Sequence, residues 1–439
     1  MTKNIFYTSF LLLLAVAVQA QENVYPVPAA SGSVFITNAT IHVGNGQVIN
    51  NGSIKINNGK IEQVGANLPV PADAKLYDVK GKQVYPGMIL PNSDLGLKEI
   101  GSGVRGSNDY VEIGEYNPSV RSIVAYNTDS KIINTLKANG ILLAAVAPQG
   151  GVISGSSSVV QLDAWNWEDA AYKMENGIHI NLPSFIVRTG RRGGFIGFPG
   201  AQQPPTDPAK EALDKIAEIK DFFTEARTYL QEGTHKEVNL KYEAVKGLFD
   251  KKQKLFIHAD QVKQMLVAID FVKEFNFDVV LVGASECWQI APLLKQNNIA
   301  VILNKEHSLP TTEDDDVDQP YKTPAVLQKA GVLFALNDDN EETRYRNLAF
   351  NAGTAAAYGL TKEEALQAIT LNAATILGIA DKTGSIEVGK DANIIVSEGD
   401  LLDMKSSIIT HAFIQGRLVS LDNKQQQLYE RYKYKYGLK

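Results

Sequence analysis

The feature that most constrains the fold is a change of pattern between the two ends of the chain and its middle. Both ends carry short β-like segments, whereas the middle alternates short apolar runs with helix-length amphipathic segments, most regularly from residue 255 onward. Such alternation is typical of β-α units that build a parallel sheet. Over residues 86–382 it predicts a TIM-type (β/α)8 barrel of the α/β class, with a doubly wound sheet as the alternative.

The two ends predict a second, smaller domain. Asn-Gly pairs at residues 45–46, 51–52 and 58–59 punctuate the segment 34–85, and Asn-Gly is a strong signal for a hairpin turn. The segment 383–422 offers matching apolar strands. We therefore expect one composite β-sandwich built from both chain ends, preceded by a linker at 21–33 and followed by a polar tail at 423–439.

The first twenty residues predict export. Lys3 precedes an apolar run over residues 5–18, and Val18-Gln19-Ala20 is a small-residue end typical of a signal-peptide cleavage site. The run is too short to span a membrane, and no other segment approaches 18 apolar residues. We expect a mature chain that begins at Gln21, has no membrane span and is soluble in the periplasm.

Cysteine content excludes an internal disulfide, and charge disfavours a nucleic-acid partner. The single cysteine, Cys287, cannot form an internal disulfide, so the stability of the fold must come from its apolar core. Cleavage of the signal peptide removes Lys3 and takes the formal charge from −6 to −7, which disfavours nucleic acid as a partner.

Residues 361–378 predict one helix near the end of the barrel region. Thr361 and Glu364 have the spacing of a capping box, an apolar stripe runs from Ala365 to Leu377, and Gly378 suits the position just after a helix.

Two motifs resemble the amidohydrolase superfamily, and its imidazolonepropionase-like members in particular. They are Tyr85-Pro86-Gly87-Met88-Ile89 before the first expected barrel strand and, late in the chain, Thr370-Leu371-Asn372-Ala373-Ala374 with Gly384-Ser385-Ile386-Glu387-Val388-Gly389-Lys390-Asp391. They bracket nearly the whole mature chain, although Asn393 stands where the family usually has Asp. The resemblance implies a barrel flanked by a β-sandwich, with the active site at the carboxyl ends of the strands. It also implies hydrolysis of non-peptide carbon–nitrogen bonds by water that one or two divalent metals, such as zinc, activate.

Strand one departs from the family pattern. Members of the family carry His-x-His after the Pro-Gly motif, but this chain reads Asn92-Ser93-Asp94. Amide and carboxylate oxygens suit harder ions better than they suit zinc. The segment is either an oxygen-rich metal site that includes Asp94 or a structural turn.

The resemblance carries the other ligand positions over one at a time. Strand five ends in His258, which matches a family ligand, whereas strand six has Gly283 where a His is usual. The family's strand-eight Asp, a metal ligand and general base, falls on Asp339, with Asp338 as the neighbouring alternative. The structural alternatives are a core histidine for His258 and a helix N-cap for the aspartates.

Two functions remain open at this stage. His307 follows the expected seventh strand, and convergence of His258, His307 and Asp339 would give the three protein ligands of a catalytic zinc. Asp94 is the alternative third ligand. The chain would then be a hydrolase with one metal. Loss of three of the usual four histidines favours instead a homologue without metal or catalysis, which binds a small molecule or pairs, as a homo- or hetero-oligomer, with a related active amidohydrolase.

Overall fold

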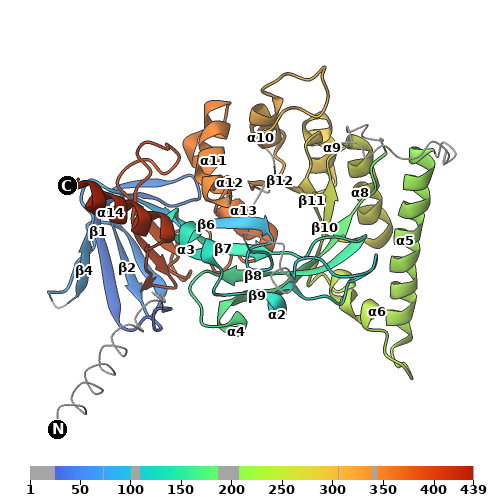
Figure 1. Ribbon diagram of the computed structural model, residues 1–439, viewed down its shortest axis with the longest axis horizontal. Coiled ribbons are helices and arrows are strands. Elements are labelled where there is room, and N and C mark those ends of the chain that lie inside the picture. The colour runs from blue at the N-terminus through green and yellow to red at the C-terminus, as the bar shows by residue number, and fades with distance from the viewer. Residues whose placement is uncertain are drawn as a thin grey trace, which may run out of the picture.

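A computed structural model describes residues 25–72, 74–99, 109–185, 207–304, 306–338 and 344–438. The predicted signal peptide and Asp339 lie outside these residues. Figure 1 shows the sheet built from the chain ends at one end of the molecule and the helix α5 (Pro208–Glu232) at the other, with the barrel strands between them.

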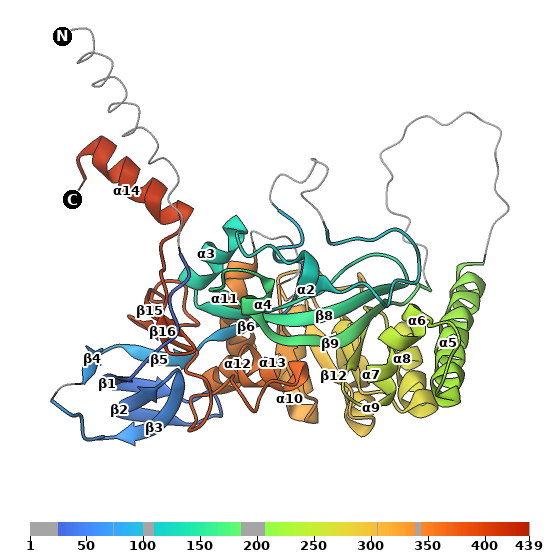
Figure 2. The same ribbon diagram turned by 90° about the horizontal axis from the view of Figure 1, so that it is seen from below.

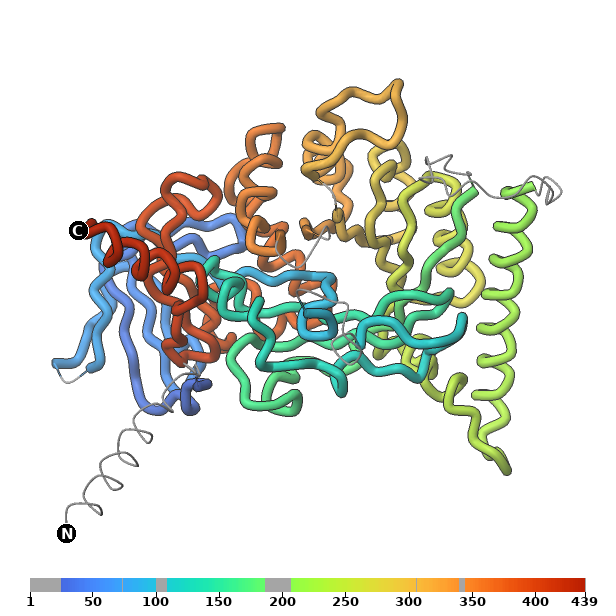
Figure 3. The backbone as a smooth tube through the Cα atoms, in the orientation of Figure 1, coloured from blue at the N-terminus to red at the C-terminus, as the bar shows by residue number. Residues whose placement is uncertain are grey.

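The two chain ends share one eight-stranded sheet. Its order is β16-β15-β14-β5-β1-β2-β3, and β4 pairs with β1. The C-terminal strand β14 lies antiparallel to the N-terminal strand β5, and Figure 3 shows the blue and red parts of the chain side by side. Because the described strands form one continuous sheet, the two facing sheets of a sandwich stay a prediction. The strands are β1 (Ser33–His42), β2 (Val48–Asn57), β3 (Lys60–Ala66), β4 (Lys75–Asp78), β5 (Gln83–Pro86), β14 (Ile394–Ser397), β15 (Ile409–Ile414) and β16 (Arg417–Leu418).

The Asn-Gly pairs of this sheet do not all form turns. Asn58 and Gly59 connect β2 to β3 with φ values of 47° and 83°, the conformation of a two-residue hairpin turn. Asn51, by contrast, lies inside β2 with a φ of 50°, where the pairing with β1 shifts register. The turn predicted at residues 51–52 is therefore wrong, and the residue forms a bulge instead.

The barrel sheet runs in the order of the sequence, from β6 to β13. A doubly wound sheet would reverse its order in the middle, so the alternative architecture is excluded. The sheet is nearly closed, and the backbone N–H of Asn92, at the end of β6, donates to Asn337 Oδ1, just after β13, at 3.4 Å. The strands are β6 (Met88–Ser93), β7 (Ile141–Val146), β8 (Ile153–Gln161), β9 (Ala171–Asn181), β10 (Lys254–Ala259), β11 (Val279–Gly283), β12 (Ala300–Leu303) and β13 (Phe334–Leu336).

Strand β8 departs from the all-parallel barrel. It runs antiparallel to both β7 and β9, whereas every other neighbouring pair of the barrel sheet is parallel. The reason is the length of its connections, residues 147–152 and 162–170, because a parallel crossover needs a dozen or more residues.

Helices cover the barrel in the order that the repeat predicts. In the second half, α8, α9 and α10 follow β10, β11 and β12 in turn (Figure 1). Figure 2 shows α5, α8 and α9 at the end of the molecule away from the sheet built from the chain ends. Among the described helices none is long and apolar enough to cross a membrane. The helices besides α5 are α2 (Ser122–Ala125), α3 (Lys131–Ala138), α4 (Trp167–Ala170), α6 (Leu240–Ala244), α7 (Lys246–Phe249), α8 (Val262–Phe275), α9 (Ala291–Gln296), α10 (Gln319–Ala330), α11 (Leu348–Ala357), α12 (Lys362–Ala368), α13 (Leu371–Leu377) and α14 (Lys424–Tyr436), with short 3₁₀ turns η1 (Cys287–Ile290) and η2 (Tyr345–Asn347).

The helix predicted over residues 361–378 is divided. Its capping box is confirmed, since Thr361 Oγ1 accepts from the backbone N–H of Glu364 at 3.2 Å. The chain then leaves the helical conformation at Thr370, whose hydroxyl donates to the carbonyl of Leu366 at 2.6 Å. A threonine that bonds back to the preceding turn competes with the helix, and α12 and α13 result. Gly378 ends α13 with a φ of 71°.

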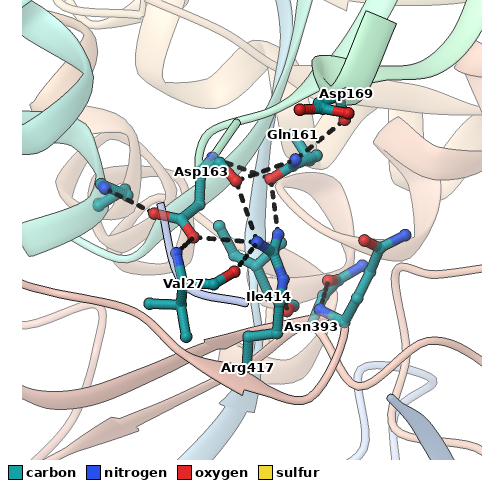
Figure 4. A network of polar contacts seen from close by, with 9 residues as sticks. Val27, Gln161, Asp163, Asp169, Asn393, Ile414 and Arg417 are labelled. Carbon is teal, nitrogen blue, oxygen red and sulfur yellow. Dashed lines mark hydrogen bonds and ion pairs between the residues drawn. The ribbon is translucent and has the colours of Figure 1, made fainter. Parts of the chain in front are cut away.

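A buried polar network joins the chain ends to the barrel. Asp163, just after β8, pairs with Lys137 of α3 at 3.2 Å and with Arg417 of β16 at 3.1 Å (Figure 4). The backbone of Val27 completes the network, because its N–H donates to Asp163 Oδ2 and its carbonyl accepts from Arg417 Nη1. One aspartate thus contacts the N-terminal segment, the barrel and the C-terminal sheet.

Candidate functional site

A cavity of about 510 Å³ lies at the carboxyl ends of β6, β9 and β10. Asn92 and Asp94 line it from β6 and the residues just after it, His258 from β10, and Tyr345 from η2. Active sites of (β/α)8 barrels lie at this end of the strands. Three of the residues singled out in the sequence therefore share one cavity. Its other polar lining residues are Ser93, Lys98, Gln149, Ser154 and Asn181.

The Asp94 carboxylate is held by a tyrosine. Tyr345, which is buried, donates its hydroxyl proton to Asp94 Oδ1 at 2.6 Å, and Gln149 Nε2 lies 3.5 Å from the other oxygen. A short hydrogen bond to a charged acceptor is among the stronger ones in proteins. One oxygen of Asp94 is therefore engaged within the protein.

His258 faces a second histidine, His179 of β9. Their facing atoms, His179 Nδ1 and His258 Nε2, are 3.0 Å apart, and the His179 ring stacks on Phe256 with centroids 4.7 Å apart. Burial lowers the pKa of His258 to about 4, and burial and the neighbouring ring lower the pKa of His179 well below its usual value. Both rings are neutral at pH 7, so one nitrogen donates to the other.

Asn92 carries a buried acceptor beside the cavity. Its side chain is buried, and its Oδ1 atom has no hydrogen-bond partner among the described residues. Its backbone contacts Asn337, whose Nδ2 donates to Asn304 Oδ1 at 3.0 Å. Strands one, seven and eight thus all end in amide side chains.

Gly283 is unsuited to the histidine that the family carries on strand six. Its φ is +96°, and a Cβ atom built on it would lie 2.8 Å from Asp260 Oδ1. That oxygen accepts from Ser285 Oγ at 2.8 Å, which holds it in place. A larger side chain at this position would be strained and would also collide with Asp260.

The other predicted ligands are placed differently. His307 is exposed, its Nε2 lies 2.8 Å from Thr354 Oγ1, and it is not among the residues that line this cavity. Asp338 is buried, with Arg344 Nε 3.7 Å from its Oδ1. Asp339 lies outside the described residues.

The metal-type side chains of the described residues form no cluster. Within residues 25–338, apart from the gaps given above, and 344–438, no three His, Cys, Asp or Glu side chains form a group that could hold a metal ion. Of the ligands predicted from the sequence, Asp94 and His258 line the cavity, and each makes a hydrogen bond within the protein.

Sequence reasoning missed His179 and Tyr345. The alternation Ile178-His179-Ile180 is typical of a strand with its histidine on one face, which was the available signal for His179. Tyr345 follows strand eight in a short 3₁₀ turn, and nothing in the local sequence indicates that it reaches Asp94.

A nearly closed barrel with a polar cavity at the carboxyl ends of its strands defines an enzyme-like small-molecule site. The family model described as "Amidohydrolase family" matches residues 167–419. This range is more than half of the chain, and the chain belongs to the amidohydrolase family. The resemblance drawn from the two motifs is confirmed.

Similar proteins agree with this assignment. The imidazolonepropionase of Thermoplasma volcanium is 25% identical over 368 residues, which cover 80% of this chain and 85% of that protein. A crystal structure of an amidohydrolase from Thermotoga maritima is 26% identical, with a TM-score of 0.76, and covers 88% of this chain and 99% of that one. An adenosine deaminase from Xanthomonas campestris with bound zinc shares the fold at 15% identity and a TM-score of 0.53, and covers 94% of this chain and 99% of that one.

Proposed function

We propose that this chain binds a small polar molecule in the cavity lined by Asn92, Asp94 and His258, without the two-metal hydrolysis typical of its family. One observation carries the proposal. The two metal-type donors that line the cavity are engaged inside the protein, Asp94 with Tyr345 and His258 with His179. A metal that bound through the engaged atoms, Asp94 Oδ1 and His258 Nε2, would compete with these hydrogen bonds.

The lining indicates the kind of ligand. Asn92 Oδ1 needs a hydrogen-bond donor, which an amide or ureide N–H supplies. Lys98 contributes a positive charge to the same lining, which suits a carbonyl or carboxylate oxygen. The ligand class is therefore a compact amide or cyclic ureide with an acidic group, and relatives named imidazolonepropionase make a cyclic molecule of this type a natural first choice.

The test uses hydantoin-5-acetic acid, a cyclic ureide that carries a carboxylate. Calorimetric titration of the purified mature chain should show saturable binding, and Asn92→Leu should weaken it at least tenfold because the acceptor is lost. Asn50→Leu, an exposed substitution of the same type, serves as the matched control and should leave the affinity unchanged. Equal affinity of the Asn92→Leu variant and the parent chain, or release of a ring-opened product, would contradict the proposal.

A second candidate is hydrolysis with a single metal. The observation that favours it is the 3.0 Å between His179 Nδ1 and His258 Nε2, since two nitrogens bound to one tetrahedral zinc lie roughly 3.3 Å apart. His258 and His179 would hold the ion, with Asp339, which lies outside the described residues, as a further ligand, and the metal would supply an activated water. Zinc-dependent ring opening that disappears in both His179→Ala and His258→Ala would establish this candidate, and its absence would exclude it.

The placement of the protein follows from the sequence predictions. We infer that the protein is exported to the periplasm after cleavage behind Ala20. We also infer that it forms an oligomer with itself or with a related active amidohydrolase, and that the sheet built from the chain ends belongs to a β-sandwich. N-terminal sequencing of the secreted chain and its molar mass by light scattering test the first two: an uncleaved N-terminus or a strictly monomeric mass would contradict them.

A further inference from the structure

A second cavity lies beside the carboxyl ends of β11 and β12, next to α10. It shares no lining residue with the larger cavity, and its volume is about 30 Å³. That is room for about one water-sized group. The residues that matter below are Glu306, Trp288, Leu303, Leu309 and Asp315.

Glu306 is the unusual member of this lining. The residue is 2% exposed, and neither carboxylate oxygen has a hydrogen-bond partner among the described residues. A buried carboxylate is costly unless a cation or several donors complement it. The described residues supply neither, and burial together with Asp338 raises the pKa of Glu306 well above its usual value, which favours the neutral acid. A cation that entered the cavity would favour the ionised carboxylate instead.

The surroundings favour a cation over a neutral donor. Asp315 lines the same cavity, and Asp338 is close enough to act electrostatically on Glu306. Among the described residues that line it there is no Lys, Arg or His. These two acids disfavour a carboxylate or phosphate in the cavity, and Arg344, 3.7 Å from Asp338, offsets part of the second charge.

The size and the apolar walls narrow the choice of cation. An ammonium group is about the size of a water molecule and fits a cavity of about 30 Å³. Leu303, Leu309 and the half-buried Trp288 add apolar surface and one aromatic face. An inorganic cation buries no apolar surface against these walls, whereas an alkyl chain does.

We propose that this cavity binds the ammonium head of a small primary alkylamine, with Glu306 as its counter-ion and the alkyl chain against Trp288. The proposal is independent of the larger cavity, because the two linings share no residue. The absence of ureide binding in the larger cavity would not affect this proposal.

The test is titration of the full mature chain with n-butylamine hydrochloride, followed by ligand-observed NMR. Binding should be saturable, and Glu306→Gln, which keeps the shape of the side chain but removes the charge, should weaken it at least tenfold. Glu313→Gln removes the same charge from an exposed neighbour outside the cavity and should change the affinity less than twofold.

A ligand series on the parent chain keeps the test decisive if the Glu306→Gln variant fails to fold. Affinity should rise from methylammonium to butylammonium, and 1-butanol, which lacks the charge, should not bind. Trp288→Leu should flatten that rise. The proposal is overturned if butylammonium does not bind, if potassium ion binds as tightly as butylammonium, or if a folded Glu306→Gln variant binds like the parent.

Discussion

Gly283 lies on strand six, at the position where the resemblance to the family implies a histidine. The position combines a left-handed backbone conformation with a wall formed by Asp260, so a side chain meets two separate obstacles. We predict that Gly283→Ala lowers the free energy of unfolding by about 2–4 kcal/mol, from backbone strain plus the collision. Urea denaturation at neutral pH measures this loss.

The matched control is Gly81→Ala. Gly81 has a φ of +81°, but nothing lies within 4 Å of the Cβ position, so this variant carries the strain without the collision. Its loss should be about 1 kcal/mol. Equal losses in the two variants would show that Asp260 does not limit the size of residue 283.

His258 makes the stability of the fold depend on pH. Burial lowers its pKa to about 4, while the unfolded chain has the usual value of 6.5. Between these values the unfolded chain binds a proton that the folded chain does not, so the stability contributed above pH 6.5 is lost as the pH falls toward 4. From pH 7 to pH 5 the parent chain should lose about 2 kcal/mol more than His258→Gln does.

Denaturant titrations at the two pH values, in buffer that contains chelator, check this difference. His307→Gln, which alters an exposed histidine, should behave like the parent chain. Identical pH dependence in His258→Gln and the parent would mean that the His258 ring is not the group that resists protonation.

At the scale of elements, the network around Asp163 fixes the end-derived sheet against the barrel. Asp163→Asn leaves Lys137 and Arg417 buried without their counter-ion, and the expected loss of stability is about 3–5 kcal/mol. The control is Asp169→Asn, which removes an exposed charge nearby and should cost less than about 0.5 kcal/mol. Chemical denaturation of both variants decides, and a small loss for Asp163→Asn would show that other contacts hold the sheet.

The elements that the sequence predicted well are those with a local physical signal. The apolar runs from residue 255 onward became β10 to β13, and the capping box at Thr361 starts α12. The antiparallel β8 could not be read from local pattern, because its direction depends on how short its two connections are in the folded chain. The break at Thr370 could not be predicted either, because the apolar residues on both sides of it keep a helical spacing.

At the scale of the whole molecule, the sequence predicted the site only in part. Asn92, Asp94 and His258 were found because a family motif fixes their place on the strands, and they do share a cavity. The contacts that decide their chemistry come from distant residues, since Tyr345 lies 251 residues from Asp94 and His179 lies 79 residues from His258. The local sequence around each residue does not indicate such pairs.

For the molecule as a whole, we propose that these contacts replace the metal centre of the family. The most direct measurement is the zinc content of the untagged mature chain after incubation with excess zinc and removal of unbound metal, determined by elemental mass spectrometry. We predict less than about 0.2 equivalents of zinc per chain. A preformed site with three protein ligands would instead bind zinc with micromolar or tighter affinity and retain about one equivalent. One or two equivalents that disappear in His258→Ala would contradict the account.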